Sequence, residues 1–471
     1  MNYFKLLIFF LTISSVVEAQ NCNCSDNFHS MVDRIKNNYP GYADKITALN
    51  RSGFQKKTDS LARIASHSNP YECLSLSREW LALFKDKHVN MWIDFDAISP
   101  DSIRQFFSKE EKTSWTQNKF KLYLKYEKKY LDPIEGVWSF GVYQVGVVRD
   151  RTKKNKEFLA FVLKADSSRW MPQQVKFRLL KKDNRYRTVF FRAGDHSINY
   201  PKLKYSSDTL DFDFFGKWVR GTLKPKEIVL GNSDLSPKFR IIDPETALFT
   251  FPSFESMAYI NQVDSIVKQN KSILENTKHL IIDLRDNGGG SVYVYESLMP
   301  YIYTNPILTA GGMVLATPDN IKDGYSIKYP GVSDSIQKAL DETLIELKKH
   351  EGELYDLYPV DTIKFESIAK NPERVSFLIN KNTASAAELF LLQAKQSTKC
   401  KIFGTASAGM VDYLEVITSK LPCDFYTLVY PAGKSIYSIN NPLDNTGIKP
   451  DVELSEKIEN WVDYVKTYKE K

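Results

Sequence analysis

Residues 278–291 read KHLIIDLRDNGGGS, an apolar strand that runs directly into three consecutive glycines. Such glycines adopt positive φ and let backbone N–H groups approach a ligand, as an oxyanion site requires. The spacing matches neither G-x-G-x-x-G nor G-x-x-x-x-G-K-[ST], so the segment does not indicate nucleotide binding. A tight turn from strand to helix is the structural alternative.

A second apolar strand, RVSFLIN at residues 374–380, precedes NTASAAE at residues 382–388 and a helical stretch. Ser385 would stand in a sharp turn beside the free N–H groups at the start of that helix, where an oxyanion is stabilised. Ser385 and Glu388 also fit the S-x-x-E capping box, in which the serine only satisfies the helix N-terminus. Both roles stay open from this segment alone.

The chain around these motifs alternates strands with helices, which favours an α/β core over residues 236–471. Apolar periodicity predicts helices in INQVDSIVKQNKSILEN and in SAAELFLLQAKQ, each following one of the strands. Residues 306–372 are polar, contain a charged helical stretch, and are expected to interrupt the core as an excursion.

Two further regions precede the core. Residues 20–95 carry apolar side chains at intervals of three and four, which predicts an N-terminal helical domain. Residues 96–235 contain short alternating runs at hairpin spacing, which predict an inserted β-rich domain or small barrel. Its segment DPIEGVW, residues 132–138, resembles the opening of lipocalin-like barrels. Its only histidine is His196, so we expect the domain to shape access to the site without supplying catalytic groups.

Residues 1–19 read as a signal peptide, with a basic start, the apolar run LLIFFLTISSVV and the small-residue end VEA. We therefore expect a periplasmic or secreted protein. No later run reaches the ~20 apolar residues of a membrane span, so no transmembrane segment is expected. AQN before Cys22 lacks the residues of a lipoprotein signal, which makes a lipid anchor the less favoured expectation.

The five cysteines lie after this segment and predict two disulfides in an oxidising compartment. Cys400 and Cys423 each open a short core strand, so we expect a bridge between them and a second from Cys73 to Cys22 or Cys24. The six histidines are scattered singly, which predicts no metal and no cofactor. The 64 basic and 57 acidic residues are interleaved, so no nucleic-acid surface is expected.

Four motifs together resemble one family. The order DLRDNGGGS, TASAAE, FGTASAG and GIKPDV is similar to that of the tail-specific (C-terminal processing) and tricorn-core serine peptidases, over residues 236–455. The resemblance implies a crotonase-like core and Ser385 as the nucleophile. It also implies oxyanion donors from the N–H groups of Ala386 and of Gly288 or Gly289.

The resemblance is closer to the tricorn-like, histidine-using branch. Tail-specific members carry a basic lysine where this chain has Met410, whose thioether takes up no proton. Tricorn-like members use a histidine in a segment resembling Leu-x-Asp-x-His, so FKDKHVNMWI at residues 84–93 makes His88 the candidate base. Asp444 stands where the family has a glutamate that would orient the imidazole, and Lys87 stands where tricorn-like members have serine.

The sequence thus predicts an exported serine endopeptidase that cleaves peptides or proteins through a Ser385–His88 acyl-enzyme mechanism. Two alternatives stay open. One is a non-catalytic peptide-binding or envelope-scaffold protein, and the other is an esterase or amidase acting on a small substrate. The sequence indicates no oligomeric state.

Overall fold

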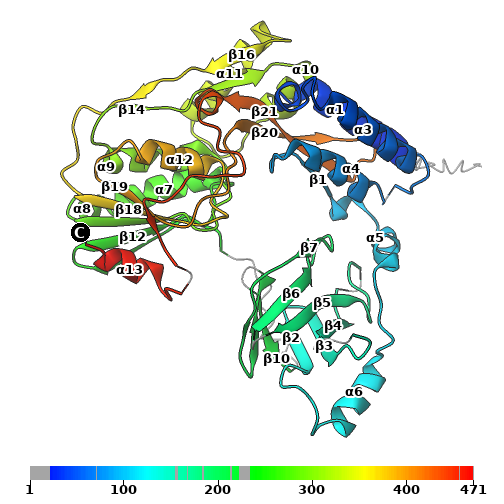
Figure 1. Cartoon of the computed structure of the whole chain (residues 1–471). Helices are drawn as coiled ribbons and strands as arrows, with labels where there is room; N and C mark the ends of the chain where they lie inside the picture. Colours follow the sequence, from blue (N-terminus) through cyan, green and yellow to red (C-terminus); the bar gives the residue numbers. More distant parts are fainter. Residues whose placement is uncertain are drawn as a thin grey trace, which may run out of the picture.

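The computed structural model describes residues 22–70, 72–153, 157–166, 168–182, 185–212, 215–221, 234–455 and 457–469. The predicted signal peptide, residues 1–19, lies outside them. Among the described helices, none is both long enough and apolar enough to span a bilayer. The chain is a mixed α/β protein built on several sheets (Figure 1).

A six-stranded sheet in the order β11-β12-β13-β18-β19-β22 carries the two motif loops. β11 runs antiparallel to β12, and every later pair in this order is parallel. The strands are β11 (Lys238–Asp243), β12 (Thr246–Thr250), β13 (His279–Asp283), β18 (Arg374–Ile379), β19 (Cys400–Gly404) and β22 (Val452–Glu453). The predicted strands around HLII and RVSFLIN are therefore confirmed. They are apolar throughout because parallel strands are covered on both faces.

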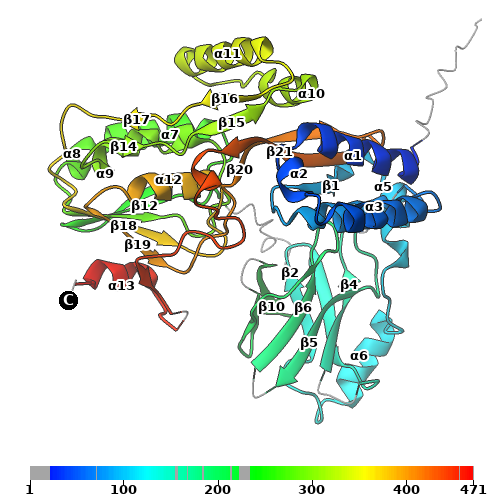
Figure 2. The same ribbon diagram turned by 45° about the horizontal axis from the view of Figure 1, so that its top comes forward.

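Helices cover both faces of this sheet (Figures 1 and 2). Phe249, Ile282 and Phe377 point into a core shared with α7, α9 and α12, whereas Ile281 and Leu378 point into a core with α13. The helices are α7 (Ala258–Gln269), α8 (Lys271–Leu274), α9 (Met299–Ile302), α12 (Ala386–Ala394) and α13 (Trp461–Thr467). β13 and β18 are neighbours with Asp283 opposite Leu378, so both motif loops leave the same edge of the sheet.

A second, antiparallel sheet has the order β1-β21-β15-β16, with β20 paired to β21. Its strands are β1 (Asn90–Ile93), β15 (Gly312–Leu315), β16 (Leu354–Tyr358), β20 (Tyr413–Lys420) and β21 (Tyr426–Ser435). β15 and β16 come from the predicted excursion, whose charged stretch forms α11 (Asp334–Lys349). The other elements of the excursion are β14 (Ile307–Leu308), α10 (Pro318–Asn320), the π-helical turn η8 (Ile321–Tyr325) and β17 (Thr362–Ile363).

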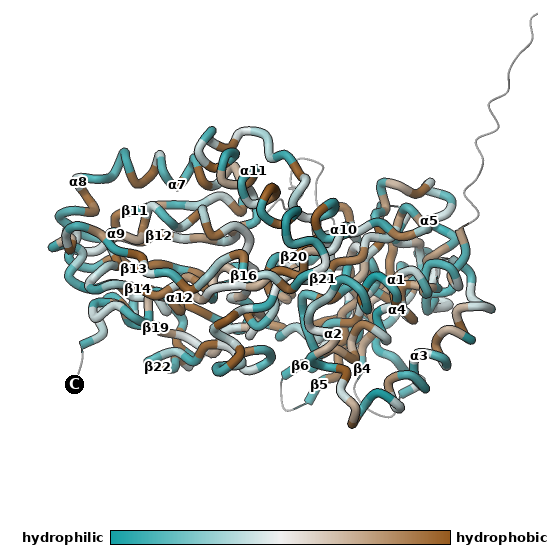
Figure 3. The backbone as a smooth tube through the Cα atoms, turned by 90° about the horizontal axis from the view of Figure 1, so that it is seen from above, coloured by the Kyte–Doolittle hydropathy of each residue, from teal (hydrophilic) through white to brown (hydrophobic). Residues whose placement is uncertain are grey.

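The N-terminal helices pack against this second sheet. They are α1 (Cys24–Asn38), α2 (Gly41–Lys45), α3 (Arg51–Ala65) and α4 (Cys73–Leu81), as the helical periodicity predicts. Phe28 and Trp80 from the helices share one core with Tyr426 and Tyr430 of β21. Seen from above, β20 and β21 lie between the six-stranded lobe and these helices (Figure 3). Where separately folding domains begin and end stays a prediction.

The β-rich region forms a nine-stranded antiparallel sheet below the helices (Figure 2). The strand order β7-β6-β5-β4-β3-β2-β10-β9-β8 is an open path around a core that contains Trp138, Phe177 and Trp218. The strands are β2 (Gly136–Phe140), β3 (Tyr143–Arg149), β4 (Glu157–Lys164), β5 (Val175–Lys182), β6 (Arg185–Phe191), β7 (Ile198–Asn199), β8 (Lys204–Tyr205), β9 (Thr209–Asp211) and β10 (Lys217–Arg220). Helices α5 (Pro100–Phe106) and α6 (Gln117–Tyr126) precede it.

The two disulfides are Cys22–Cys423 and Cys24–Cys73, and Cys400 is free. The predicted Cys400–Cys423 bridge is therefore wrong. Its premise fails because Cys400 opens β19 in the six-stranded sheet, whereas Cys423 precedes β21 in the other sheet. The Cys24–Cys73 bridge is one of the two predicted alternatives and is confirmed.

We expect Cys423→Ala to lower the free energy of unfolding by about 2–4 kcal/mol, because it opens a covalent loop that restricts the unfolded chain. Urea unfolding of the oxidised protein measures the change, with Cys400→Ala as the control that leaves both bridges intact. Recovery of Cys400 in a cross-linked peptide from the unreduced protein would contradict the observed pairing.

Candidate active site

Ser385 stands between β18 and α12 in an uncommon backbone conformation. It caps the helix with φ 54° and ψ −123°, whereas N-cap residues ordinarily adopt extended values. A positive φ is uncommon for a residue with a side chain, and such strain concentrates at functional sites. Ser385 is partly exposed, so the strained turn presents its side chain near solvent.

The glycine run meets Ser385 directly. A Cβ placed on Gly289 would lie 2.7 Å from the Cβ of Ser385 and 3.0 Å from the Ala386 nitrogen, so only glycine fits there. The φ of Gly289 is +96°, which also favours glycine. The Ala384 N–H donates to the Asn287 carbonyl oxygen at 2.9 Å and ties the two loops together.

Two backbone N–H groups face no protein acceptor at this turn. Ala386 is the first residue of α12, so its N–H has no partner within the helix. The Gly289 N–H donates to Asn287 Oδ1 at 2.9 Å. Gly288 is exposed, and no hydrogen bond of its N–H occurs within the described residues. Of the two predicted glycine donors, Gly288 is thus the one whose N–H is available.

Glu388 holds the start of α12 against the loop 407–410. Its fully buried carboxylate accepts a hydrogen bond from the Ser385 N–H at 3.0 Å, as in the predicted capping box. It also accepts from the Ser407 hydroxyl at 2.5 Å and from the Gly409 and Met410 N–H groups at 2.8 Å. Burial raises the pKa of Glu388, and these hydrogen bonds oppose the rise. The capping box and the strained serine therefore occur together.

His88 is buried just before β1, and the segment that carries it lies against the loop 407–410 through Lys87. Burial lowers the pKa of the imidazole, opposed by the charge of Asp86 and by a hydrogen bond with the Tyr413 backbone. Its Nδ1 lies 3.7 Å from Asp86 Oδ1 and has no hydrogen-bond partner. Lys87 donates to the Ala408 carbonyl oxygen. In the described part of the chain, His88 and Ser385 make no hydrogen bond to each other.

The carboxylate beside His88 is Asp86. It accepts hydrogen bonds from the His88 N–H at 2.8 Å and from the Tyr39 hydroxyl at 2.7 Å. The predicted residue, Asp444, instead pairs with Lys45 at 3.3 Å. Burial raises the pKa of Asp444 to about 7, and the charges of Asp86 and Asp412 add to the rise. Asp86 is the aspartate of the Leu-x-Asp-x-His-like segment, so the sequence contained a signal for it.

Residues 245–454 match the family model of peptidase family S41. This segment is somewhat less than half of the chain, and over it the chain is similar to the peptidases of family S41. The matched segment contains the glycine run, Ser385, the 407–410 loop and Asp444, whereas His88 lies before it.

Individual S41-like relatives are distant. A protein of Chlamydia trachomatis serovar D is 22% identical over 233 residues, which are 43% of this chain and 37% of that protein, so the chain spans little more than a third of its length. The structure of mature CPAF is 12% identical, with 92% of this chain and 93% of that one covered and a TM-score of 0.45. The tricorn protease is 12% identical, with 92% of this chain and 34% of that one covered and a TM-score of 0.37.

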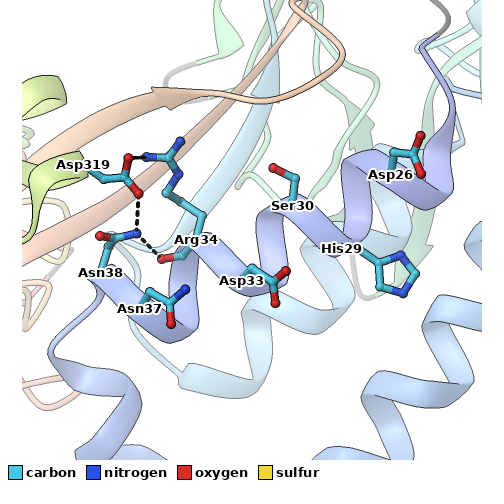
Figure 4. Close-up of a pocket in the computed structure, with 8 residues that line it drawn as sticks. All are labelled: Asp26, His29, Ser30, Asp33, Arg34, Asn37, Asn38 and Asp319. Carbon is cyan, nitrogen blue, oxygen red and sulfur yellow. Dashed lines mark hydrogen bonds and ion pairs between the residues drawn. The ribbon is translucent and has the colours of Figure 1, made fainter.

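A separate polar pocket of about 440 Å³ lies along α1 (Figure 4). Its lining includes His29 and Asp33, and Asp319 contacts both Arg34 and Asn38 there. None of the residues predicted for catalysis lines it. Across the described residues, no group of three or more His, Cys, Asp or Glu side chains could hold a metal ion.

We expect Gly289→Ala to lower the free energy of unfolding by about 1–3 kcal/mol, because the new methyl group meets Ser385 and the backbone requires positive φ. Gly288→Ala is the matched control, since a Cβ there has no neighbour within 4 Å. Thermal unfolding of both variants measures the difference, and equal melting temperatures would contradict the close contact.

The raised pKa of Asp444 has a consequence for stability. The folded chain holds this proton more tightly than the unfolded chain, so the contribution is present below the ordinary value of 3.8 and is lost as pH rises towards about 7. We expect Asp444→Asn to remove about 1–3 kcal/mol of that pH dependence, since one pKa unit is worth about 1.4 kcal/mol. Urea unfolding at pH 4 to 8 measures it, with exposed Asp356→Asn as control. Parallel curves for wild type and Asp444→Asn would contradict the shift.

Proposed function

We propose that this chain is an exported serine endopeptidase in which Ser385 forms an acyl-enzyme, on a crotonase-like core formed by residues 236–471. The observation that carries the proposal is the strained Ser385 at the N-terminus of α12, in contact with Gly289. The match of residues 245–454 to the model of peptidase family S41 supports the same reaction class. The substrate class is peptides or proteins.

In the proposed reaction, Ser385 is the nucleophile and two backbone N–H groups bind the oxyanion. Ser385 Oγ attacks the peptide carbonyl carbon while its proton passes to a base, and the carbonyl oxygen becomes an oxyanion. The N–H groups of Ala386 and Gly288 are the proposed donors to that oxygen, because neither has a hydrogen-bond acceptor among the residues that the structure describes. The C–N bond then breaks as the amine takes up the proton, and water hydrolyses the ester by the reverse sequence.

The proposed base is His88. Its lowered pKa keeps the imidazole neutral at neutral pH, which is the form that accepts a proton. Asp86, with Oδ1 3.7 Å from Nδ1, would stabilise the imidazolium, and Asp444 would act through Asp86. The mechanism requires the ring to reach Ser385 once substrate binds. Catalytic hydrogen bonds are commonly long before that point.

Export is supported by the two disulfides. Both involve cysteines close to the predicted cleavage point, Cys22 and Cys24, and bonded cysteines persist in oxidising compartments. The proposed location is therefore the periplasm or the medium.

One observation favours a non-catalytic peptide-binding protein as the second candidate. His88 has a hydrogen bond with the Tyr413 backbone and none with Ser385, as expected where the base has lost its role. A serine-directed fluorophosphonate separates the two functions, because only an activated hydroxyl reacts with it. Labelling at Ser385 supports the peptidase, and an unlabelled folded protein supports the binder.

We expect Ser385→Ala and His88→Ala each to lower turnover of a protein substrate by about 10³-fold or more, and the double variant to lose little more because the pair acts as a unit. Met410→Leu is the control and should leave turnover nearly unchanged, since Met410 contributes only its backbone N–H to the site. Release of peptides from an unfolded protein substrate measures the rates.

The rate should rise with pH through a midpoint below the ordinary histidine value of 6.5, because burial lowers the pKa of His88. Full activity in His88→Ala would refute this base.

A further inference from the structure

Glu415, on β20, has a backbone conformation as unusual as that of Ser385. Its φ is 56°, and the β20–β21 register passes from Leu414 opposite Gly433 to Val416 opposite Pro431 without a Glu415 partner. Its Cγ lies 3.2 Å from where a Cβ on Gly433 would stand. The strained backbone thus turns the Glu415 side chain across β21, where the glycine leaves room.

Tyr358, on β16, lies on the same face of this sheet. Tyr358 and Ser435 are both opposite Gly312 in register, and directly paired residues share a face of the sheet. Gly433 is two residues from Ser435 and so lies on that face as well. A Cβ on Gly312 would meet the Tyr358 ring at 3.7 Å. Glycines on β21 and β15 therefore let Glu415 and Tyr358 lie across the sheet.

One tyrosine hydrogen-bonds the Glu415 carboxylate and three more lie within range of its charge, and we call these five residues the Glu415 cluster. The Tyr325 hydroxyl donates to Glu415 Oε2 at 3.3 Å. Tyr293, Tyr329 and Tyr358 lie close enough for the Glu415 charge to raise the pKa of each hydroxyl, after the larger effect of burial.

Among the described residues, the Glu415 carboxylate has no basic side chain as an ion-pair partner. In the described part of the chain, Glu415 forms no ion pair with a lysine, arginine or histidine, although its side chain is exposed. The Ser435 hydroxyl, 1% exposed and on the same face as Tyr358, has no hydrogen-bond partner. A surface glutamate that only faces solvent requires neither a positive φ nor several neighbouring tyrosines. An exposed carboxylate without a basic partner among the described residues can instead pair with a cation of a bound ligand.

Two members of the Glu415 cluster are close in sequence to the proposed active site: Glu415 is two positions after Tyr413, whose backbone hydrogen-bonds His88, and Tyr293 follows the glycine run. Tyr293 is four positions after Gly289, so their Cα atoms are at most about 14 Å apart. The turn Val292–Val294 that carries Tyr293 also contacts α12, which Ser385 caps. A peptide whose carbonyl reaches Ser385 can therefore place a neighbouring side chain in the cluster.

We propose that the Glu415 cluster binds a lysine or arginine side chain of the substrate peptide and so selects the cleavage site. The inference rests on the proposed peptidase function. A carboxylate forms charge-assisted hydrogen bonds with such a cation, and tyrosine rings attract it through their faces. The tyrosines also pack against the long aliphatic part of the side chain.

The test compares peptides that differ only in charge. Arginine against citrulline and lysine against norleucine are near-isosteric pairs, placed within three residues of the scissile bond in otherwise identical fluorogenic peptides. Wild type should favour the basic member in kcat/KM by roughly 10- to 100-fold, the range for a hydrogen bond to a charged group. Glu415→Gln should abolish the preference, and Glu415→Lys should reverse it towards glutamate. Glu351→Gln, an exposed glutamate after α11, should keep it.

These experiments distinguish an error in the proposed role of the Glu415 cluster from an error in the proposed peptidase function. Cleavage of both peptides at equal rates, or an unchanged preference in Glu415→Gln, would overturn the cluster while leaving the peptidase intact. If Ser385 is inert to the fluorophosphonate and no peptide is cut, the peptidase fails. Binding then tests the cluster, because Ser385→Ala protein should bind the arginine peptide more tightly than the citrulline peptide, measured by fluorescence anisotropy. Equal affinities would overturn the cluster.

Discussion

The buried Glu388 carboxylate is the interaction on which the arrangement of the site depends. It accepts hydrogen bonds from Ser385, Ser407, Gly409 and Met410 at once. Without it, donors on two different segments would be left buried and unpaired, each at a cost of about 1–3 kcal/mol. The loop it fixes then continues to Tyr413, whose backbone contacts His88. One side chain in the first turn of α12 therefore orders both sides of the site.

The sequence predicts the parts of the structure that local patterns encode. HLII and RVSFLIN are apolar throughout because parallel strands are buried on both faces, and the glycine and serine motifs follow these strands directly. Adjacent parallel strands bring both motifs to one edge, which is why Gly289 and Ser385 meet.

Long-range pairing is where the sequence prediction fails. β1 follows His88 and pairs with β21, more than 330 residues later, as Asn90 opposite Val429 shows. No local pattern specifies such a partner, and for the same reason the sequence predicts the wrong partner for Cys423. The order of the motifs predicts Asp444 as the carboxylate that orients the imidazole, whereas Asp86, two positions before His88, has its Oδ1 3.7 Å from Nδ1.

His196 illustrates how packing decides what a histidine does. Its ring stacks between Phe107 and Trp170, with centroids 3.9 and 3.6 Å away. Burial and the nearby Lys176 lower its pKa to about 3, so it stays neutral in any ordinary medium. It joins the helical segment before the β-rich sheet to the sheet itself. The expectation that this region supplies no catalytic group stays a prediction.

The Cys22–Cys423 bridge makes most of this polypeptide a closed covalent ring, since the two residues are 401 positions apart. A single cut anywhere inside that ring produces no free fragment, because both new ends remain attached through the sulfur atoms. If such a molecule encounters other proteases, or cuts its own neighbours, its nicked copies keep their mass apart from one added water. They would separate into pieces only after reduction, so an oxidised sample that looks whole can already be cleaved.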